Sequence, residues 1–383
     1  MLNIFLSAAI SFVITCLAIP AIIRVAEEKK LYDLPDERKL HTKHIASLGG
    51  VGIFIGFILS TLLSIYKNNP EFQYFFASAI VIFFLGLKDD ILILSARKKF
   101  LGQLAATAII IHLGNIRIEG MYGLFGVEKL PEIISILLTY ITIIVVVNAF
   151  NLIDGVDGLA GGLGFFTTVL FGSYFLMAGM PVYSILAFAM AGSLLAFLIF
   201  NFHPARIFMG DSGSLLIGLI NAILVIKFIT VAHSPVSAIH LDSSVAIGFS
   251  ILLLPLLDTL RVFSIRIAKG KSPFCPDRTH IHHLLLDRGL NHRAVTLICI
   301  AYNLSFVGLA WFGRSLGSTW LLTIMFISSF SILGALLYFR RLPSQFIITN
   351  TFQQNIEPTV APARKLVTIK NEPVIVEAVS QEN

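Results

Sequence analysis

Five polar segments, three of which contain glycine, interrupt an otherwise apolar chain of 383 residues. They carry carboxylate, amide, imidazole and ammonium side chains, the groups that bind cations and phosphates in proteins. The segments are 41–44, 86–90, 148–158, 209–213 and 277–283.

The adjacent carboxylates of Asp89 and Asp90 fit either of two interpretations. Neighbouring carboxylates repel each other, so one should hold a proton unless a cation or an ammonium group compensates. Such a pair serves as a metal anchor or as a base beside a metal. The alternative is an interfacial charge pair that ends a helix, neutralised by Lys88 and the basic run 97–99.

Four oxygen-bearing side chains recur every third residue in segment 148–158: Asn148, Asn151, Asp154 and Asp157. On a helix they would form a polar stripe that drifts around the axis. The glycines that follow make an unwound stretch equally compatible, with Asn and Asp in turn roles as the alternative. Carboxylates at membrane depth cost about 2.5–3.5 kcal/mol each, which favours a site at the membrane interface with a bound cation or ligand.

Asp211 stands between Gly210 and Gly213, directly before an apolar stretch. A helix N-cap is the default interpretation of a carboxylate there. The flanking glycines would also leave it accessible to a hard cation. Oxygen ligands such as those of Asn151 and Asp211 suit Mg²⁺ or Mn²⁺ better than zinc.

Three histidines, His280, His282 and His283, follow Arg278 within six positions. Zinc ligation is one possibility, but the spacing is short and the other polar segments are rich in carboxylates. Recognition of a diphosphate fits better, because the arginine fork matches phosphate oxygens.

The composition identifies lipid as the solvent for most of the chain. It is 56% hydrophobic and 13% charged, whereas soluble domains are about a quarter charged. This excludes an ordinary soluble enzyme, a disordered chain and a fibrous protein. Three cysteines at unrelated spacings form no disulfide or zinc pattern. The +6 net charge suits anionic lipid or an anionic substrate, and no aromatic-basic module indicates nucleic acid.

The apolar stretches predict an all-α, polytopic bundle of about 11 transmembrane spans, or 10 if the short stretch 100–113 lies within the bundle. The predicted spans are 3–23, 48–66, 72–87, 100–113, 133–150, 161–178, 182–200, 213–231, 244–263, 295–312 and 317–338.

The basic residues predict the orientation of these spans. With the loop after the first span on the cytoplasmic side, that side collects 23 of the 28 Lys and Arg residues and the other side four. The N-terminus is then outside and the C-terminus inside. All five polar segments fall on the cytoplasmic side, which predicts one site at that face. The predicted domains are a membrane catalytic part, 1–340, and a cytoplasmic tail, 341–383, either disordered or holding a short strand near 374–376.

Together, the segments resemble the polyprenyl-phosphate N-acetylhexosamine-1-phosphate transferase family, glycosyltransferase family 4. The resemblance covers residues 1–340 and is carried by the Asp pair, by N-x-x-D-G-x-D-G at 151–158 and by M-G-D-S-G at 209–213. The H-I-H-H pattern at 280–283 is similar to the branch that acts on N-acetylglucosamine. The peptidoglycan branch, the phospho-MurNAc-pentapeptide translocases, typically has three consecutive histidines there.

The resemblance implies a bacterial inner-membrane enzyme that transfers N-acetylhexosamine-1-phosphate, most simply GlcNAc-1-phosphate, from a UDP-sugar to undecaprenyl phosphate and releases UMP. The product would begin an envelope polysaccharide of the O-antigen, common-antigen or teichoic-acid type. The implied roles are Mg²⁺ (or Mn²⁺) binding by Asn151 and Asp211, and catalysis by Asp89 and Asp90. Substrate binding is implied for Lys43, Asp154, Asp157, Arg278, His280, His282 and His283.

Two other functions compete with this interpretation: transport of an anionic sugar phosphate, and the phospho-MurNAc-pentapeptide translocase reaction. Against transport, the carboxylates gather at span ends rather than at mid-membrane, and no internal repeat is evident. The sequence leaves the route, direct attack or a covalent aspartyl intermediate, open. It also leaves open the oligomeric state, with a homodimer among the options.

Overall fold

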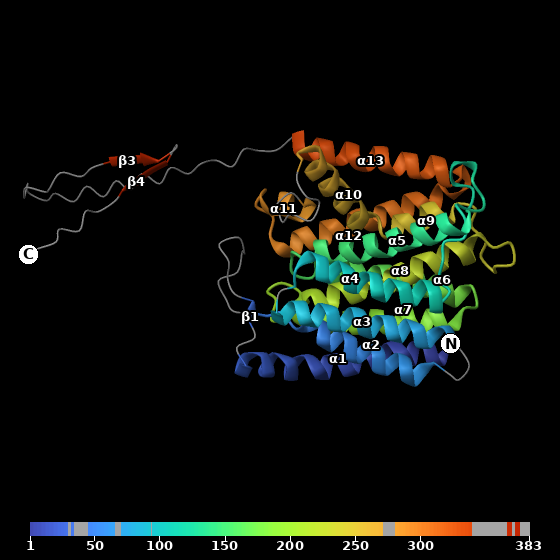
Figure 1. Cartoon of the computed structure of the whole chain (residues 1–383), viewed down its shortest axis with the longest axis horizontal. Coiled ribbons are helices and arrows are strands. Elements are labelled where there is room, and N and C mark those ends of the chain that lie inside the picture. The colour runs from blue at the N-terminus through green and yellow to red at the C-terminus, as the bar shows by residue number, and fades with distance from the viewer. Residues whose placement is uncertain are drawn as a thin grey trace, which may run out of the picture. The chain divides into compact units, whose positions relative to one another are not determined.

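Each of the eleven apolar stretches coincides with one helix or with a consecutive pair of helices (Figure 1). The computed structural model describes residues 1–29, 32–33, 45–65, 70–92, 94–270, 280–338, 366–369 and 372–375. Its α-helices are α1 (Leu2–Lys29), α2 (Gly49–Ser64), α3 (Pro70–Leu92), α4 (Ala96–Ala108), α5 (Glu132–Ile153), α6 (Leu159–Met177), α7 (Pro181–Asn201), α8 (Gly210–His233), α9 (Ser244–Ile251), α10 (Leu253–Ala268), α11 (Ile281–Leu286), α12 (His292–Phe312) and α13 (Ser318–Tyr338).

The remaining elements are short. A π-helical turn, Ile109–Leu113, prolongs α4, and 3₁₀ turns occupy Leu124–Gly126 and Arg314–Leu316. Strands β1 (Tyr32–Asp33) and β2 (Ile45–Ala46) pair antiparallel, as do β3 (Leu366–Ile369) and β4 (Glu372–Ile375). The chain divides into two units, Met1–Arg341 and Leu342–Asn383, and the β3–β4 hairpin belongs to the second.

The protein is an all-α polytopic membrane protein. Seven of the helices in the described ranges are long and apolar enough to cross a membrane, or eight if the bent pair α9–α10 forms one span. The stretch 244–263, predicted as one span, is therefore not a straight helix: it breaks at Leu252 with a bend of 81°. Pro255, in the first turn of α10, cannot donate a backbone hydrogen bond to the preceding turn, which explains why the helix restarts there.

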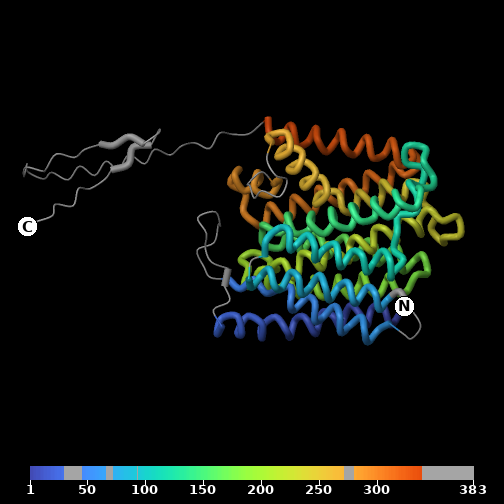
Figure 2. The backbone as a smooth tube through the Cα atoms, in the orientation of Figure 1, coloured from blue at the N-terminus to red at the C-terminus, as the bar shows by residue number. Residues whose placement is uncertain are grey.

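Burial ranks the helices from centre to rim, and the backbone trace in Figure 2 shows the long helices lying side by side. In α8, 78% of the most apolar stretch of 18 residues is buried within the protein, whereas in α1 and α13 only 22% of the corresponding stretch is buried. Because α1 and α13 expose apolar residues such as Leu17 and Ile327, their outer faces are suited to lipid.

Two glycines bring α8 close to α3. A Cβ at Gly86 would lie 2.6 Å from the backbone carbonyl of Asp211. One at Gly210, where φ is +73°, would lie 2.3 Å from the Ser47 carbonyl oxygen and 2.7 Å from the carboxylate of Asp90 on α3. Only glycine fits such approaches without displacing backbone. The glycines of segments 86–90 and 209–213 thus allow the end of α3 to meet the beginning of α8.

Candidate active site

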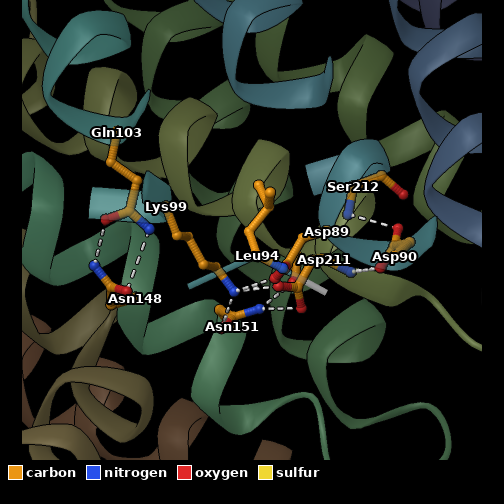
Figure 3. Close-up of polar contacts among 10 residues, drawn as sticks. Asp89, Asp90, Leu94, Lys99, Gln103, Asn148, Asn151, Asp211 and Ser212 are labelled. Carbon is orange, nitrogen blue, oxygen red and sulfur yellow. Dashed lines mark hydrogen bonds and ion pairs between the residues drawn. The ribbon is translucent and has the colours of Figure 1, made fainter. Parts of the chain in front are cut away.

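Side chains from three helices converge on the ammonium group of Lys99 (Figure 3). Lys99 lies in the first turn of α4, and its Nζ is 3.1 Å from Asp89 Oδ2 and 3.4 Å from Asn151 Oδ1. It also forms an ion pair with Asp211 Oδ2. Residues from the end of α3, the last turn of α5 and the first turn of α8 are thereby held at one point.

The amide of Asn151 fixes the position of Asp211. Its Nδ2 donates hydrogen bonds to Asp211 Oδ1 at 2.7 Å and to Ser214 Oγ at 3.0 Å. This orientation leaves Asn151 Oδ1 directed at the ammonium group. Asp211 lies inside the first turn of α8, whose N-cap is Met209, so the N-cap interpretation of Asp211 is wrong.

The two carboxylates of the Asp pair point in different directions. Asp89 contacts Lys99 and accepts a hydrogen bond from the backbone N–H of Leu94. Asp90 accepts hydrogen bonds from the backbone N–H groups of Asp211 and Ser212. Only Asp89 of the pair faces the group of oxygens around Lys99.

The polar repeat in 148–158 does not stay on one helix. α5 ends at Ile153, so Asp154 and Asp157 lie in the turn that leads to α6. Asn148 faces α4 and exchanges two hydrogen bonds with Gln103, at 2.9 Å and 3.3 Å. Paired amides of this kind hold two transmembrane helices together.

A cavity of about 590 Å³ opens beside this cluster. Its volume falls within the range of small-molecule sites. One part of the lining is polar or charged and the other apolar, which suits an amphipathic ligand. The lining residues are Asp89, Arg97, Lys99, Gln103, Asn148, Asn151 and Arg266, with Leu94, Ala96, Phe100, Leu152 and Phe263.

The electrostatics favour a cation at this point. Asp154 is partly buried, and its burial, together with the charges of Asp211, Asp90 and Asp157, raises its pKa to about 8. When neighbouring carboxylates raise one another's pKa, a nearby positive charge lowers the pKa values again and favours the ionised forms. The oxygens of Asp89, Asn151 and Asp211 already surround one ammonium group, and hard oxygen donors are those that Mg²⁺ and Mn²⁺ prefer.

Asp157 anchors the turn after α5 to two other segments. It lies 2.6 Å from His203 Nδ1, its backbone N–H donates to His292 Nδ1 at 3.4 Å, and its carbonyl accepts from Thr296 Oγ1 at 2.9 Å. Burial alone would raise the pKa of Asp157, but hydrogen bonds from the two histidines and the Ala205 N–H outweigh it and hold the pKa at about 2. Asp157 therefore stays ionised and fixes this end of the bundle.

The histidine segment is held by a buried carboxylate on α10. Asp258 accepts hydrogen bonds from His280 Nδ1 at 2.8 Å and from the Ile281 N–H at 3.0 Å, and it pairs with Arg261 at 3.1 Å. His282 is buried with its Nε2 against Gly155, where an added Cβ would lie 2.5 Å away. The histidine segment thus meets the turn 154–158 directly.

The structure therefore brings together the described parts of segments 86–90, 148–158, 209–213 and 277–283. Residues 49–50, which follow segment 41–44, contact the same region. The backbone N–H groups of Gly49 and Gly50 donate to the carbonyls of Phe208 and Met209, at 2.9 Å and 2.8 Å. Lys43 and Arg278 lie outside the described residues.

Sequence reasoning missed several residues of this region. Lys99 entered only as one of several possible neutralising charges, and Asp258, His203 and His292 were not singled out. Asp258 carried a usable signal, since an ionisable residue inside the apolar stretch 244–263 indicates a functional or paired position. His203 and His292 carried none, because an isolated histidine in a loop is common.

Comparison with known proteins places this arrangement in a family. The model of "Glycosyl transferase family 4" matches residues 72–229. A probable undecaprenyl-phosphate N-acetylglucosaminyl 1-phosphate transferase of Bacillus subtilis is 30% identical over 298 residues, 78% of this chain and 81% of that protein. A decaprenyl-phosphate N-acetylglucosaminephosphotransferase of Mycobacterium tuberculosis is 34% identical over 308 residues, covering 73% and 74%.

A further relative extends the comparison to Escherichia coli strain K12. Its undecaprenyl-phosphate alpha-N-acetylglucosaminyl 1-phosphate transferase is 28% identical over 318 residues, 81% of this chain and 84% of that protein. The match to the family model, residues 72–229, includes the helices that carry Asp89, Asn151 and Asp211. The chain belongs to glycosyl transferase family 4.

Proposed function

We propose that the protein transfers N-acetylglucosamine-1-phosphate from UDP-N-acetylglucosamine to a polyprenyl phosphate, undecaprenyl phosphate in a bacterial membrane, and releases UMP. The similar proteins from three organisms carry names that describe this class of transfer. The observation that carries the proposal is the convergence of Asp89, Asn151 and Asp211 beside a cavity that has both charged and apolar walls.

The reaction exchanges one phosphoanhydride bond for another. An oxygen of the lipid phosphate bonds to the phosphorus attached to the sugar, and the bond from that phosphorus to the bridging oxygen breaks. UMP leaves with the bridging oxygen, and the product is a lipid-linked diphosphate sugar. Little covalent chemistry falls to the protein, so positioning and charge neutralisation are its main tasks.

Asn151 and Asp211 are the proposed ligands of Mg²⁺ or Mn²⁺, with Asp89 within reach of the same point. When bound, the ion would neutralise charge on the diphosphate. Asp89 orients or deprotonates the acceptor phosphate, while Asp90 holds the start of α8 in place. Asp154, Asp157, His280, His282 and His283 form the donor side, to which we also assign Lys43 and Arg278.

We further propose eleven crossings, with the N-terminus outside, the C-terminus inside and the site at the cytoplasmic face of the inner membrane. The basic residues support this orientation, because they concentrate on the side that carries the site. The donor is water-soluble and the acceptor phosphate lies at headgroup level, so a site at the inner interface meets both. The chemistry resides in 1–340, and a chain truncated after residue 342 should keep its activity.

The decisive experiment supplies membranes with UDP-[¹⁴C]GlcNAc and undecaprenyl phosphate and follows UMP release and labelled lipid. Stoichiometric UMP and a lipid whose mass fits GlcNAc-diphosphate-undecaprenol are expected. Label that enters sealed vesicles without UMP release would instead support transport. A panel of other UDP-N-acetylhexosamines tests the choice of sugar. Accessibility of cysteines introduced by Lys88→Cys and His283→Cys tests the topology, which requires both to react from the cytoplasmic side.

A further inference from the structure

Lys99 occupies an unusual position for a lysine on a membrane helix. Its side chain is only 18% exposed, and its Nζ lies among oxygens of Asp89, Asn151 and Asp211, which come from three other helices. Lys98, its neighbour, is exposed. The contrast between two adjacent lysines shows that Lys99 is held by its partners rather than by general attraction to the acidic region.

We propose that the Lys99 ammonium group is a tethered substitute for the divalent cation: it occupies the position among Asp89, Asn151 and Asp211 in the metal-free protein, and cation binding displaces it. The inference rests on the proposed function only in that the site takes a divalent cation. It adds that the Lys99 ammonium group and the divalent cation compete for one position, and that the cation binds before the phosphate.

Charge and geometry support this exchange. Asp89 and Asp211 would repel each other without a positive charge between them, so the ammonium group offsets this repulsion and holds both side chains in place. Mg²⁺ binds carboxylate oxygens at about 2.0–2.1 Å, so an ion bound to these three side chains would occupy the point where the ammonium nitrogen now lies, and the two cations cannot both be there. The site is therefore prearranged for a cation by a group that must leave when the cation arrives.

The displaced ammonium group stays close, because its helix does not have to move. Lys99 lines the 590 Å³ cavity together with Arg97 and Arg266. A flexible four-carbon stem can redirect the ammonium group into this space, where it would meet an entering phosphate. Cation binding would thus convert Lys99 from a counterion of carboxylates into a donor for phosphate, so that the cation binds first and the phosphate second.

The first test measures Mn²⁺ affinity of the full-length protein in detergent, without substrates, from the EPR signal of free Mn²⁺. We expect Lys99→Met to bind Mn²⁺ about tenfold more tightly than the wild type, equivalent to about 1.4 kcal/mol. Lys98→Met removes the same charge one position away and should change affinity by less than about twofold. An unchanged or weaker affinity in Lys99→Met, or equal gains in both variants, would overturn the proposal.

The second test needs no substitution and so does not depend on the variant folding. The wild-type protein is treated with an amine-acylating reagent, with and without saturating Mn²⁺, and the two lysines are quantified by mass spectrometry. Mn²⁺ should increase labelling of Lys99 relative to Lys98. Unchanged or reduced labelling of Lys99 would refute displacement. Both readouts are independent of turnover, so a missing transferase activity would contradict the proposed function while leaving this inference standing.

Discussion

The carboxylate of Asp90, near the end of α3, accepts hydrogen bonds from the backbone N–H groups of Asp211 at 2.6 Å and Ser212 at 3.0 Å, at the start of α8. The first N–H groups of a helix have no partner within it, and a carboxylate there also interacts favourably with the helix dipole. Asp90 therefore caps α8 from another helix. In doing so it sets the position of Asp211, which faces Asn151 and Lys99.

Replacing Asp90 should consequently affect stability as well as the cation site. We expect Asp90→Ala to destabilise the protein by about 0.5–2 kcal/mol, the usual cost of a lost cap. Asp90→Asn should lose less, since its one carbonyl oxygen can still accept one of the two N–H groups. Thermal unfolding in detergent, compared with the exposed control Asp242→Ala, measures this difference. Equal stability of Asp90→Ala and the control would contradict the capping role.

Asp89 should behave differently from Asp90, because it faces the cavity rather than a helix end. We expect Asp89→Asn to lower turnover strongly while the KM for the UDP-sugar changes little, as an acceptor-side role requires. Steady-state kinetics with both substrates varied provides the measurement. A variant that lost only donor affinity would show that Asp89 acts on the donor side.

Asp211→Asn should abolish cation-dependent transfer while the protein still inserts into the membrane. The asparagine retains one oxygen and can keep a contact with Asn151, but it loses the charge that holds a divalent ion. We expect Mn²⁺ affinity to fall by more than the roughly 10- to 100-fold typical of outer-shell changes. Titration of the purified variant, with membrane yield as the control for insertion, checks this. Near-normal turnover would remove Asp211 from the cation site.

How much the sequence could predict differs between the fold and the site. The apolar stretches were sufficient to place a helix at each predicted span, since the length and hydropathy of a segment are local properties. The bend at Leu252 was not predicted, although Pro255 in the same stretch is a local signal for a break in a helix. The motif residues Asp89, Asn151 and Asp211 were predictable as a group because their residue types are unusual in an apolar chain.

Their individual contacts were not predictable in the same way. The sequence treats Asp89 and Asp90 as equivalent, whereas adjacent residues on a helix point about 100° apart, so only one of them can face the cluster. In the sequence, Lys99 is one of three consecutive basic residues, 97–99. Which of the three reaches the carboxylates depends on the angle between α3 and α4. Such relationships arise from tertiary geometry, which a single sequence does not encode in any local pattern.

The contact between Asp258 and His280 predicts a positioning role for Asp258. This carboxylate holds both His280 and the N–H that starts α11. We expect Asp258→Asn to raise the KM for the UDP-sugar by about tenfold, in the range of outer-shell effects, with a smaller change in kcat. Asp258→Glu should restore part of the loss. Ser264→Ala, on the exposed face of the same helix, is the control. A parallel fall in kcat and stability, without a change in KM, would indicate a merely structural role.

The buried imidazole of His282 predicts a dependence of stability on pH. Burial, reinforced by His283, lowers the pKa of His282 from 6.5 to about 3. Between these two values the unfolded chain binds a proton that the folded protein does not, so stability is fully present above about pH 6.5 and falls as the pH drops toward 3. At pH 5 the loss attributable to this group is about 2 kcal/mol.

His282→Gln removes that titration and should therefore lose less stability between pH 7.5 and pH 5 than the wild type does. Thermal unfolding at the two pH values provides the comparison, and His240→Gln, at a side chain that is 40% exposed, controls for removal of a histidine as such. A glutamine is neutral at both pH values and keeps its hydrogen-bonding capacity. The unfolding temperature of the His282→Gln variant should therefore change with pH only through the other titratable groups. If the wild type and His282→Gln lost equal stability on acidification, the imidazole would have to be accessible to protons in the folded protein, and the close packing of His282 against Gly155 would not persist in solution.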